Sequence, residues 1–440
     1  MLGEWPEYPL EELCELIVDC PHSTPKWTDQ GVVVLRNQYI RNGRLDLSDP
    51  SYTTEEGYEA RIKRAVPTAG DLVLTREAPM GEVCKIPEGL RCCLGQRMVL
   101  IRANSDLIDP DYLLFVIQSP YVQHQISWSE GTGTTVSNIR LPDLRGFKIP
   151  TPSLAIQRWI ASVLKSLDDK TALNRQINTT LESMAQALFK SWFVDFDPVI
   201  DNALAAGNDI PDELQARAER RRELLARGAT ARTSTLPADI QSLFPNAFVL
   251  TEEMGWVPEG WGVGVIEDLL VLQRGFDLPK NARTDGEYPL MAASGQDGTH
   301  NEFKVSGPGI TTGRSGKLGE VCFVETDFWP LNTTLWVKEF RRSSPYHAFY
   351  LLKSMDLEKY NSGSAVPTLN RNYVHNVSAL LPSAGVIAAY DKFVSACYSK
   401  NYDNDEQCKS LANLRDSLLP KLLSGQLSIP DAEQTLDEVS

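Results

Sequence analysis

Amide, guanidinium and hydroxyl side chains recur in the predicted loops of both halves of the sequence. Side-chain amides and guanidiniums can form paired hydrogen bonds with the edges of nucleic-acid bases, while hydroxyls and backbone amides can hold phosphates. For any one of these residues, a solvated loop position or a local turn bond is an equally good interpretation. The candidates are Arg76, Gln96, Arg97, Thr135, Ser137, Asn138 and Arg140 in the first half, and Arg314, Ser315, Lys317, Asn332, Thr334, Thr368, Asn370 and Arg371 in the second.

Motifs for catalysis are missing from the sequence. Enzymes that methylate DNA bases need an Asn/Asp-Pro-Pro-Tyr/Phe tetrapeptide, and Asp109-Pro110-Asp111-Tyr112 only resembles it by chance. The stretch from Gly309 to Lys317 lacks the spacing and the final hydroxyl of a phosphate-binding G-x-x-x-x-G-K-[ST] loop. The few histidines form no H-E-x-x-H motif. We therefore expect no catalytic residue, no metal site and no cofactor in this chain.

The length and charge of the chain set limits on its organisation. At 440 residues it is too long for one ordinary core, and two or three domains are expected. The net charge of -15 argues against nucleic-acid binding, because contacts with phosphates need Lys and Arg. A binding function therefore requires the cations to be concentrated on one face, or partner proteins to supply further contacts.

The cysteines and the apolar segments suggest a cytoplasmic protein. No apolar run approaches the ~18 to 20 residues of a membrane span, and the first residues do not resemble a secretory signal. The eight cysteines include no C-x-x-C motif with a partner pair, so a zinc framework is not expected. They are interpreted as reduced thiols, mostly small buried side chains.

The two halves carry the same elements in the same order. The tetrapeptide Gly81-Glu82-Val83-Cys84 recurs as Gly319-Glu320-Val321-Cys322. In each half a predicted strand that delivers an Arg to a loop precedes this tetrapeptide, and a strand that starts after an amide residue follows it. A short apolar helix comes next. Two copies of one domain are the economical explanation.

Each half ends in a long helical pattern. From Ile156 to Leu188 the apolar residues, Met184 among them, step by three and four, as in the seam of a coiled coil, and a looser version runs from Ile387 to Leu422. Polar residues interrupt both seams near their middles. If the helices pair antiparallel these residues meet, and a buried polar layer can fix the register. The alternative is two ordinary helices, each packed on its own domain. The interrupting residues are Lys170 and Asn174 in the first seam and Asn401 and Asn404 in the second.

The segment between the halves differs in composition. Residues 195–253 are rich in Ala, Pro and Asp, which predicts a solvated linker with one short helix from Asp212 to Leu225. This helix contains three consecutive arginines, Arg220 to Arg222. A solvated helix face is a better interpretation of them than a contact with DNA.

Three segments together resemble the specificity subunits of type I restriction-modification enzymes. The resemblance covers nearly the whole chain in the expected order, although the candidate recognition domains match only in outline. The segments are Leu167-Asp168-Asp169-Lys170 through Asp195-Phe196-Asp197-Pro198, Leu243-Phe244-Pro245 with Gly255-Trp256-Val257-Pro258-Glu259-Gly260-Trp261, and Leu418-Leu419-Pro420-Lys421-Leu422-Leu423-Ser424-Gly425.

The resemblance implies a non-catalytic DNA-recognition subunit with an α+β fold. Two pseudo-repeated α/β target-recognition domains would be separated by two long helices that form an antiparallel coiled coil. Each domain would recognise one half of a bipartite double-stranded DNA site, and the helices would set the gap. Two methylation subunits with S-adenosylmethionine would dock on this chain, and restriction subunits that use ATP and Mg²⁺ would join through them.

Two alternatives to this function remain: a methyltransferase or nuclease that acts alone, and a structural protein with duplicated domains on a helical stalk.

The expected boundaries follow from the repeat and the resemblance. The expected parts are recognition domain 1 at 1–153, the central helix at 154–194, the linker at 195–253, recognition domain 2 at 254–385, the distal helix at 386–427 and a disordered tail at 428–440.

Overall fold

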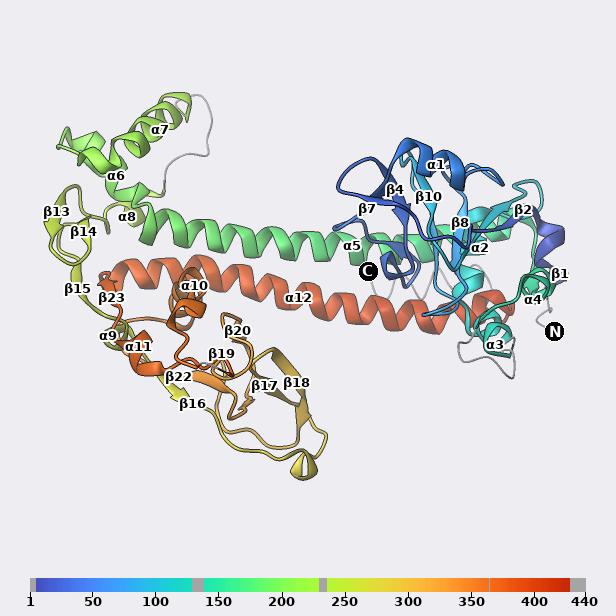
Figure 1. The fold of residues 1–440 in the computed structure, drawn as a ribbon. Helices are drawn as coiled ribbons and strands as arrows, with labels where there is room; N and C mark the ends of the chain where they lie inside the picture. The colour runs from blue at the N-terminus through green and yellow to red at the C-terminus, as the bar shows by residue number, and fades with distance from the viewer. Residues whose placement is uncertain (1–4, 129–137, 229–235, 364, 428–440) are drawn as a thin grey trace. The chain divides into compact units, whose positions relative to one another are not determined.

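The chain forms two compact units in the computed structural model, which describes residues 5–128, 138–228, 236–363 and 365–427 (Figure 1). The first unit comprises Met1–Arg175 together with Asn404–Ser440, and the second comprises Gln176–Asp403. The expected tail at 428–440 lies outside the described residues.

A four-stranded antiparallel sheet with the strand order β2-β11-β8-β9 is the centre of the first unit. Leu72 and Leu74 of β8 pack with helix α2 (Pro110–Gln118), whereas Val73 packs into a separate cluster. Successive side chains of a strand point to opposite faces, so both faces of this sheet are buried. This explains why β8 is an apolar run without polar alternation. The strands are β2 (Cys14–Asp19), β8 (Leu72–Thr75), β9 (Val83–Lys85) and β11 (Met98–Ala103).

A second sheet of the first unit has the order β10-β4-β7-β3, with β4 and β10 parallel. Leu35 of β4 and Leu94 of β10 join the same cluster as Val73, so the two sheets share a core. Its strands are β3 (Trp27–Thr28), β4 (Val32–Leu35), β7 (Ser51–Thr53) and β10 (Cys92–Leu94). The other elements are β1 (Glu7–Pro9), β5 (Ile40–Arg41), β6 (Arg44–Leu45), β12 (Lys148–Pro150), α1 (Glu55–Arg61), α3 (Pro120–Trp128) and α4 (Leu141–Gly146), with 3-10 turns at Leu10–Leu13 and Asn37–Tyr39.

The second unit repeats this plan. Its central sheet has the order β16-β22-β19-β20, and a second sheet has the order β18-β17-β21 with β17 and β21 parallel. The strands are β13 (Phe248–Thr251), β14 (Gly255–Pro258), β15 (Gly262–Val265), β16 (Leu270–Arg274), β17 (Tyr288–Ala292), β18 (Gly295–His300), β19 (Gly309–Gly313), β20 (Val321–Val324), β21 (Trp329–Pro330), β22 (Thr334–Phe340) and β23 (Ser378–Leu381). The short helices are α9 (Ile266–Leu269), α10 (Pro345–Ser354) and α11 (Arg371–His375), with 3-10 turns at Lys280–Ala282 and Leu357–Tyr360.

The two central sheets agree in strand order and in register. Asp19 at the end of β2 and Arg274 at the end of β16 occupy the same place opposite their partner strands. Gly81 and Gly319, which open the repeated tetrapeptide, adopt φ angles of 87° and 82°. Glycine is favoured there because a side chain would strain this left-handed conformation. The duplicated α/β domain predicted from the sequence is confirmed.

The long helices α5 (Leu154–Phe189) and α12 (Ala384–Leu423) pair in the first unit. Asp168 of α5 contacts Arg415 of α12 at 3.1 Å. Further along α5, Asn174 donates from Nδ2 to Oε1 of Gln407 at 2.8 Å. Moving forward along α5 therefore means moving backward along α12, so the helices are antiparallel.

The same two helices also pair antiparallel in the second unit. Asn178 donates to the carbonyl of Asn401, and the Tyr390 hydroxyl donates to the carbonyl of Ala185, both at 3.3 Å. Met184, which the sequence pattern placed in the seam, is 57 % exposed, whereas Ala185 is buried. The antiparallel pairing is confirmed, but the seam shifts by one residue here, since Ala185 and not Met184 belongs to the buried apolar cluster.

Most of the polar residues predicted to set the register lie at the contact between the helices. Asn174 and Asn404 are buried, with 1 % and 2 % exposure, and Asn401 accepts the bond from Asn178 through its carbonyl. Lys170 is exposed, so it does not belong to the buried layer. The buried position next to it is Thr171, whose hydroxyl donates to the Leu167 carbonyl of its own helix.

The segment after α5 is more ordered than the solvated linker expected from its composition. A π-helical turn at Lys190–Val194 leads into α6 (Asp197–Ala206), α7 (Asp212–Gly228) and α8 (Ala238–Gln241). α6 and α7 share a small apolar core. The expected single helix is thus one part of a helical hairpin, and the prediction missed α6 because Pro and Asp at its start resemble a loop.

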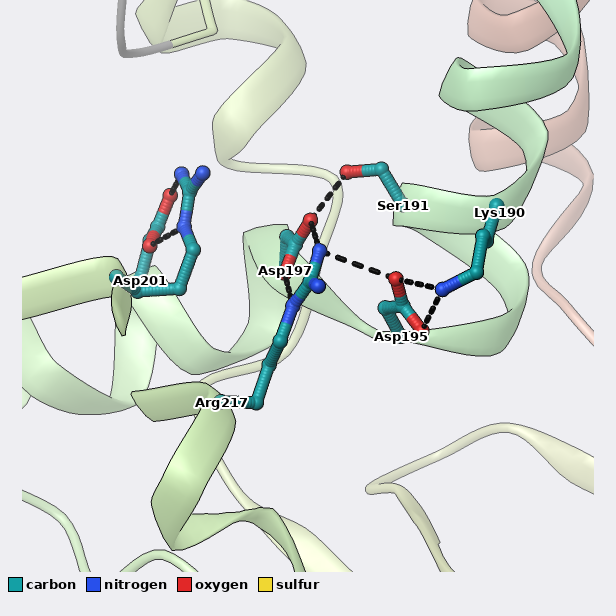
Figure 2. A network of polar contacts seen from close by, with 7 residues as sticks. Lys190, Ser191, Asp195, Asp197, Asp201 and Arg217 are labelled. Atoms are coloured by element: carbon teal, nitrogen blue, oxygen red, sulfur yellow. Dashed lines mark hydrogen bonds and ion pairs between the residues drawn. The ribbon is translucent and has the colours of Figure 1, made fainter. Parts of the chain in front are cut away.

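Polar contacts fix this hairpin to the end of α5 (Figure 2). Arg217 of α7 donates to both carboxylate oxygens of Asp197 at 2.7 Å, and Ser191 donates to the same carboxylate at 2.8 Å. Arg221, the middle residue of the three arginines, pairs with Asp201 of α6. Burial raises the pKa of Asp197, but the bonds from Arg217 and Ser191 outweigh it and hold the pKa below its ordinary value.

The eight cysteines are free thiols. Cys20, Cys84, Cys92 and Cys93 are buried. Burial raises the pKa of Cys84 and of Cys92 to about 12, so neither forms an appreciable amount of the reactive thiolate near neutral pH. Among the helices of the described ranges, none combines the length and the apolar character that a membrane crossing requires.

We predict that Arg217→Ala loosens the α6–α7 hairpin. The free energy of its local opening should fall by about 1–3 kcal/mol, because the buried Asp197 carboxylate loses its charged donor. Hydrogen exchange of the α6 and α7 amides measures this change. Arg220→Ala, at an exposed position three residues further along α7, is the matched control and should change little.

The pH dependence of this effect has a defined sign. In the parent protein the lowered pKa of Asp197 contributes stability above the ordinary carboxyl pKa of about 3.9, and this contribution is lost as the pH falls through the folded-state value. The difference between Arg217→Ala and the parent should therefore be largest near neutral pH and should shrink in acid. A difference that stays constant from pH 7 to pH 3 would contradict a role for the Asp197 charge.

Candidate nucleic-acid interface

Three loops meet at one end of the central sheet in the first domain. The Arg76 amide donates to the Arg97 carbonyl at 2.8 Å, and the Ile139 amide donates to the Arg76 carbonyl at 3.2 Å. These residues follow β8, precede β11 and precede α4, respectively. Because β8 and β11 are antiparallel, the end of one lies beside the start of the other. The described candidate residues of this domain are therefore brought to one edge.

The second domain builds the same junction. The Arg314 amide donates to the Thr333 carbonyl, and the Leu369 amide donates to the Arg314 carbonyl, both at 2.8 Å. Ser315 also bridges to Thr368 on the third loop. Arg314 thus occupies the position of Arg76, as the spacing of the repeat predicted.

Arg76 is a structural residue of the first junction. It is buried, with 9 % exposure. Its Nε donates to the Ile139 carbonyl, and its guanidinium pairs with Asp19, both at 2.8 Å. His22 also lies against this carboxylate, with 3.0 Å between Nε2 and Oδ2. The hypothesis that Arg76 contacts DNA is not supported, because its charge is neutralised and covered.

The other described candidates of the first domain are more accessible. Arg97 is exposed with a φ of 67° and lies 3.2 Å from the carboxylate of Glu77. Arg140 is exposed and pairs with Asp143 at 2.7 Å. The Gln96 amide donates to the His22 carbonyl. Asn138 is half-buried, and Thr135 and Ser137 lie outside the described residues.

The second junction differs from the first in its charges. Arg314 donates from Nε to the Asn332 carbonyl at 3.0 Å. Burial and the neighbouring charge of Arg274 lower the pKa of Arg314. Arg274 is 53 % exposed and only 3.5 Å from Asp277, whose carboxylate also accepts a bond from the Asn332 amide.

The different charges of the two junctions arise from one position in the first strand of each central sheet. The amide after Asp19 donates to the Met98 carbonyl, and the amide after Arg274 donates to the Thr334 carbonyl. Asp19 and Arg274 are therefore equivalent residues of opposite charge. The first junction neutralises its central arginine, whereas the second places another arginine beside it.

The remaining candidates of the second domain fall into two groups. Thr334 and Asn370 have local structural roles: Thr334 is fully buried and donates to the Leu331 carbonyl, and Asn370 caps α11 by accepting from an amide at 3.0 Å. Lys317 is exposed and pairs with Glu320 at 2.8 Å. Arg371 is exposed and makes one long contact, 3.5 Å, with a backbone carbonyl. Lys317 and Arg371 remain candidates for contacts with phosphates.

Sequence reasoning missed four charged residues of the junctions: Asp19, Glu77, Arg274 and Asp277. The available signal was the register of the first strand of each domain, since extending the alignment of the repeat to its end would have paired Asp19 with Arg274. Sequence spacing could not assign the contacts of Asp19 and Glu77, because Arg76 and Arg97 lie in different segments from them, whereas Asp277 lies only three residues after Arg274.

The arrangement can bind anions and base edges through exposed cations and amides. In the described part of the chain, no group of three His, Cys, Asp or Glu side chains could hold a metal ion. Two histidines of the second domain bond to the backbone or pack in the core: Nε2 of His375 accepts from the Leu272 amide at 2.8 Å, and burial lowers the pKa of His347 to about 3.

We predict a large effect on stability for Arg76, at the centre of the first junction, and a small one for Arg274 of the second junction. Arg76→Gln should lower the free energy of opening of β8 and β11 by about 2–4 kcal/mol, because the mostly buried Asp19 loses its charged partner. Arg274→Gln should change the equivalent strands by no more than about 0.5 kcal/mol, because its guanidinium is exposed. Hydrogen exchange of both central sheets measures the two effects in the full chain. An Arg76→Gln effect as small as that of Arg274→Gln would refute the structural role.

Comparisons with known proteins match this chain to the specificity subunits of type I restriction enzymes. Residues 3–183 match the model of the type I restriction modification DNA specificity domain. The chain is 26 % identical to the HindI specificity subunit of Haemophilus influenzae over 372 residues, which cover 75 % of this chain and 80 % of that protein. It is 23 % identical to the MjaIX specificity subunit of Methanocaldococcus jannaschii over 439 residues, which cover 94 % and 88 %.

A solved structure shows the same fold. The S subunit of a type I restriction-modification system from M. genitalium superposes with a TM-score of 0.56, covering 95 % of this chain and 96 % of that one at 16 % identity. The domain model matches the first part of the chain and the two relatives align with most of it, so the chain is similar to type I restriction-modification specificity subunits over most of its length.

Proposed function

We propose that this chain recognises DNA for a type I restriction-modification complex, with each domain contacting one half of a bipartite site. One observation carries the proposal. The same three-loop junction is built twice in one chain, with equivalent backbone bonds but with Asp19 in one copy where Arg274 stands in the other. A shared frame with different side chains suits two domains that recognise different sequences, because base contacts depend on the side chains.

The reactions are assigned to partner proteins. Methylation subunits with S-adenosylmethionine, two for each copy of this chain, would modify adenines within the recognised site. Restriction subunits that use ATP and Mg²⁺ would associate through them. The absence of methyltransferase and ATPase motifs from the sequence supports this division.

The paired helices are proposed to set the distance between the half-sites. Helix α5 has 36 residues, which correspond to about 54 Å at a rise of ~1.5 Å per residue. One turn of DNA is about 34–36 Å long, so a helix of this length can bridge two half-sites on the same face of the duplex. The buried Asn174 and Asn404 support a fixed register, which a constant gap requires.

The test of the proposed function is a map of methylated adenines. The chain is co-expressed with the methylation subunit encoded beside it, in a host that lacks adenine methylation. We expect modification at one bipartite motif with a constant gap. A stable complex that modifies no motif would contradict DNA recognition by this assembly, and the absence of any complex would favour a structural protein.

We further predict that the gap follows the helix length. Inserting one heptad after Arg175 in α5 and another before Asn404 in α12 preserves the seam and adds about 10 Å to each helix. The gap of the methylated motif should grow by about three base pairs at ~3.4 Å each, while both half-sites stay unchanged. As a control, the same heptad is inserted in the 229–235 segment, outside the paired helices, and should leave the gap unchanged. A constant gap in the double insertion would contradict the proposal that the paired helices set the distance between the half-sites.

A further inference from the structure

The first unit contains a cleft of about 410 Å³ that is lined by four arginines. It lies between the β5–β6 hairpin and the parts of α5 and α12 that belong to this unit. The hairpin contributes Arg41 and Arg44, α5 contributes Arg175, and α12 contributes Arg415. The lining carboxylates are Asp46 and Asp168, so the cations exceed the carboxylates by two. This excess is notable in a chain whose net charge is -15.

Two of the arginines are held in place by the helix α5. The Arg44 guanidinium donates to the backbone carbonyl of Asp168, and Arg415 pairs with the Asp168 carboxylate at 3.1 Å. Arg415 also pairs with Asp416 at 3.0 Å. A guanidinium has five N–H donors, so both side chains keep donors beyond these contacts. Both guanidiniums are thus held in position while some of their N–H groups stay available for a ligand.

Arg41 is not held in place in this way. Its side chain is exposed, and its guanidinium donates to the carbonyl of the adjacent residue at 2.9 Å. It stands beside the turn Asn42-Gly43, where φ angles of 50° and 79° give the tight two-residue connection of a hairpin. The turn therefore presents Arg41 from a stiff support, which reduces the entropy lost on binding.

The polar neighbours of the arginines suit a phosphodiester backbone. The amide side chains Gln38 and Asn42 also line the cleft. Arginine and amide side chains are among the groups that contact DNA phosphates in proteins, and guanidiniums match the geometry of phosphate oxygens. Nucleic acid is a better occupant than an acidic protein segment, because the cleft adjoins the junction that is proposed to contact DNA.

The cleft is also linked to the recognition junction of the same domain. The Asn37 amide donates to the Glu77 carbonyl, and the Asn42 backbone amide donates to the Glu82 carboxylate at 2.8 Å. Glu77 and Glu82 bound the loop that follows Arg76. The hairpin with Arg41 and Arg44 is therefore braced against the loop that leads away from the junction.

We propose that this cleft binds phosphates of the DNA backbone next to the half-site of the first domain. The inference rests on the proposed function and deepens it. Part of the cleft is formed by α5 and α12, the helices assigned to the gap. The phosphates that it holds therefore belong to nucleotides of the gap, whose sequence is not recognised, and the contact adds affinity without adding specificity.

The experiment compares Arg41→Gln/Arg44→Gln with the parent in the complex with the methylation subunit. Arg91→Gln is the matched control, since it removes an exposed arginine of the same unit outside the cleft. The probes are a duplex with the mapped target and a duplex with both half-sites scrambled, titrated from about 50 to 200 mM salt. Thermal unfolding and complex formation are measured for every variant, and Arg41→Gln alone serves if the double variant does not fold.

We expect the double variant to bind both duplexes about 3- to 30-fold more weakly at 100 mM salt. Its plot of log affinity against log salt should be shallower by about 1 to 2, one for each lost phosphate contact. Ethylation of phosphates on the gap side of the first half-site should interfere with the parent but not with the double variant. The methylated motif should stay the same.

Two outcomes would overturn the inference. Affinity and salt dependence equal to those of Arg91→Gln would show that the cleft contacts no phosphate. Failure of the folded variant to join the methylation subunit, with its own DNA affinity unchanged, would make the cleft a protein docking site. If the parent does not prefer the target, the proposed function fails separately, and the scrambled duplex still decides whether the cleft binds the backbone.

Discussion

The antiparallel pairing of α5 and α12 is the interaction on which both units depend. The main core of the first unit contains Ile160 and Leu164 from α5 together with Leu418 and Leu422 from α12. The core of the second unit takes the other ends of the same helices, with Phe189 as one member. Each domain is thus completed by a helix that begins or ends far away in the sequence. A parallel arrangement could not supply both cores, because the ends of the helices would be exchanged.

The sequence was sufficient to predict the duplication and the helices. The repeated Gly-Glu-Val-Cys segment and the spacing of three and four carry strong signals, since the first marks a backbone position that needs glycine and the second marks one buried face. The second sheets were not predicted. Strands as short as Trp27–Thr28 and Trp329–Pro330 contain no measurable alternation. The seam was misplaced at Lys170 and Met184 because their neighbours Thr171 and Ala185 are buried instead, and periodicity does not distinguish adjacent residues at a point where the spacing drifts.

The candidate contacts were predicted less well than the fold. Spacing located Arg76 and Arg314 at equivalent loop positions, but it could not show that Asp19, 57 residues earlier, neutralises the first of them. Thr334 was selected for its hydroxyl, yet that hydroxyl closes its own turn. Side-chain roles of this kind depend on contacts between distant segments. They become visible only when the strand registers are known.

The charge distribution explains how an acidic chain can still bind a polyanion. At physiological salt, charges more than about 8–10 Å away are largely screened, so a phosphate responds to its near neighbours and not to the net charge of -15. At the first junction each arginine has a carboxylate beside it: Arg76 contacts Asp19, Arg97 contacts Glu77 and Arg140 contacts Asp143.

Arginines that are paired with carboxylates suit specific recognition of DNA better than general attraction of it. An arginine that must leave its carboxylate to bind a base gains little binding free energy when the base is the wrong one, which favours specificity over affinity. The first domain then needs attraction from another source, and its arginine cleft has the required excess of cations. In the second domain Arg274 stands where the first has Asp19, so its junction retains more positive charge of its own. Under the proposed function, the two domains would therefore divide affinity and specificity differently, although one duplicated fold supports both.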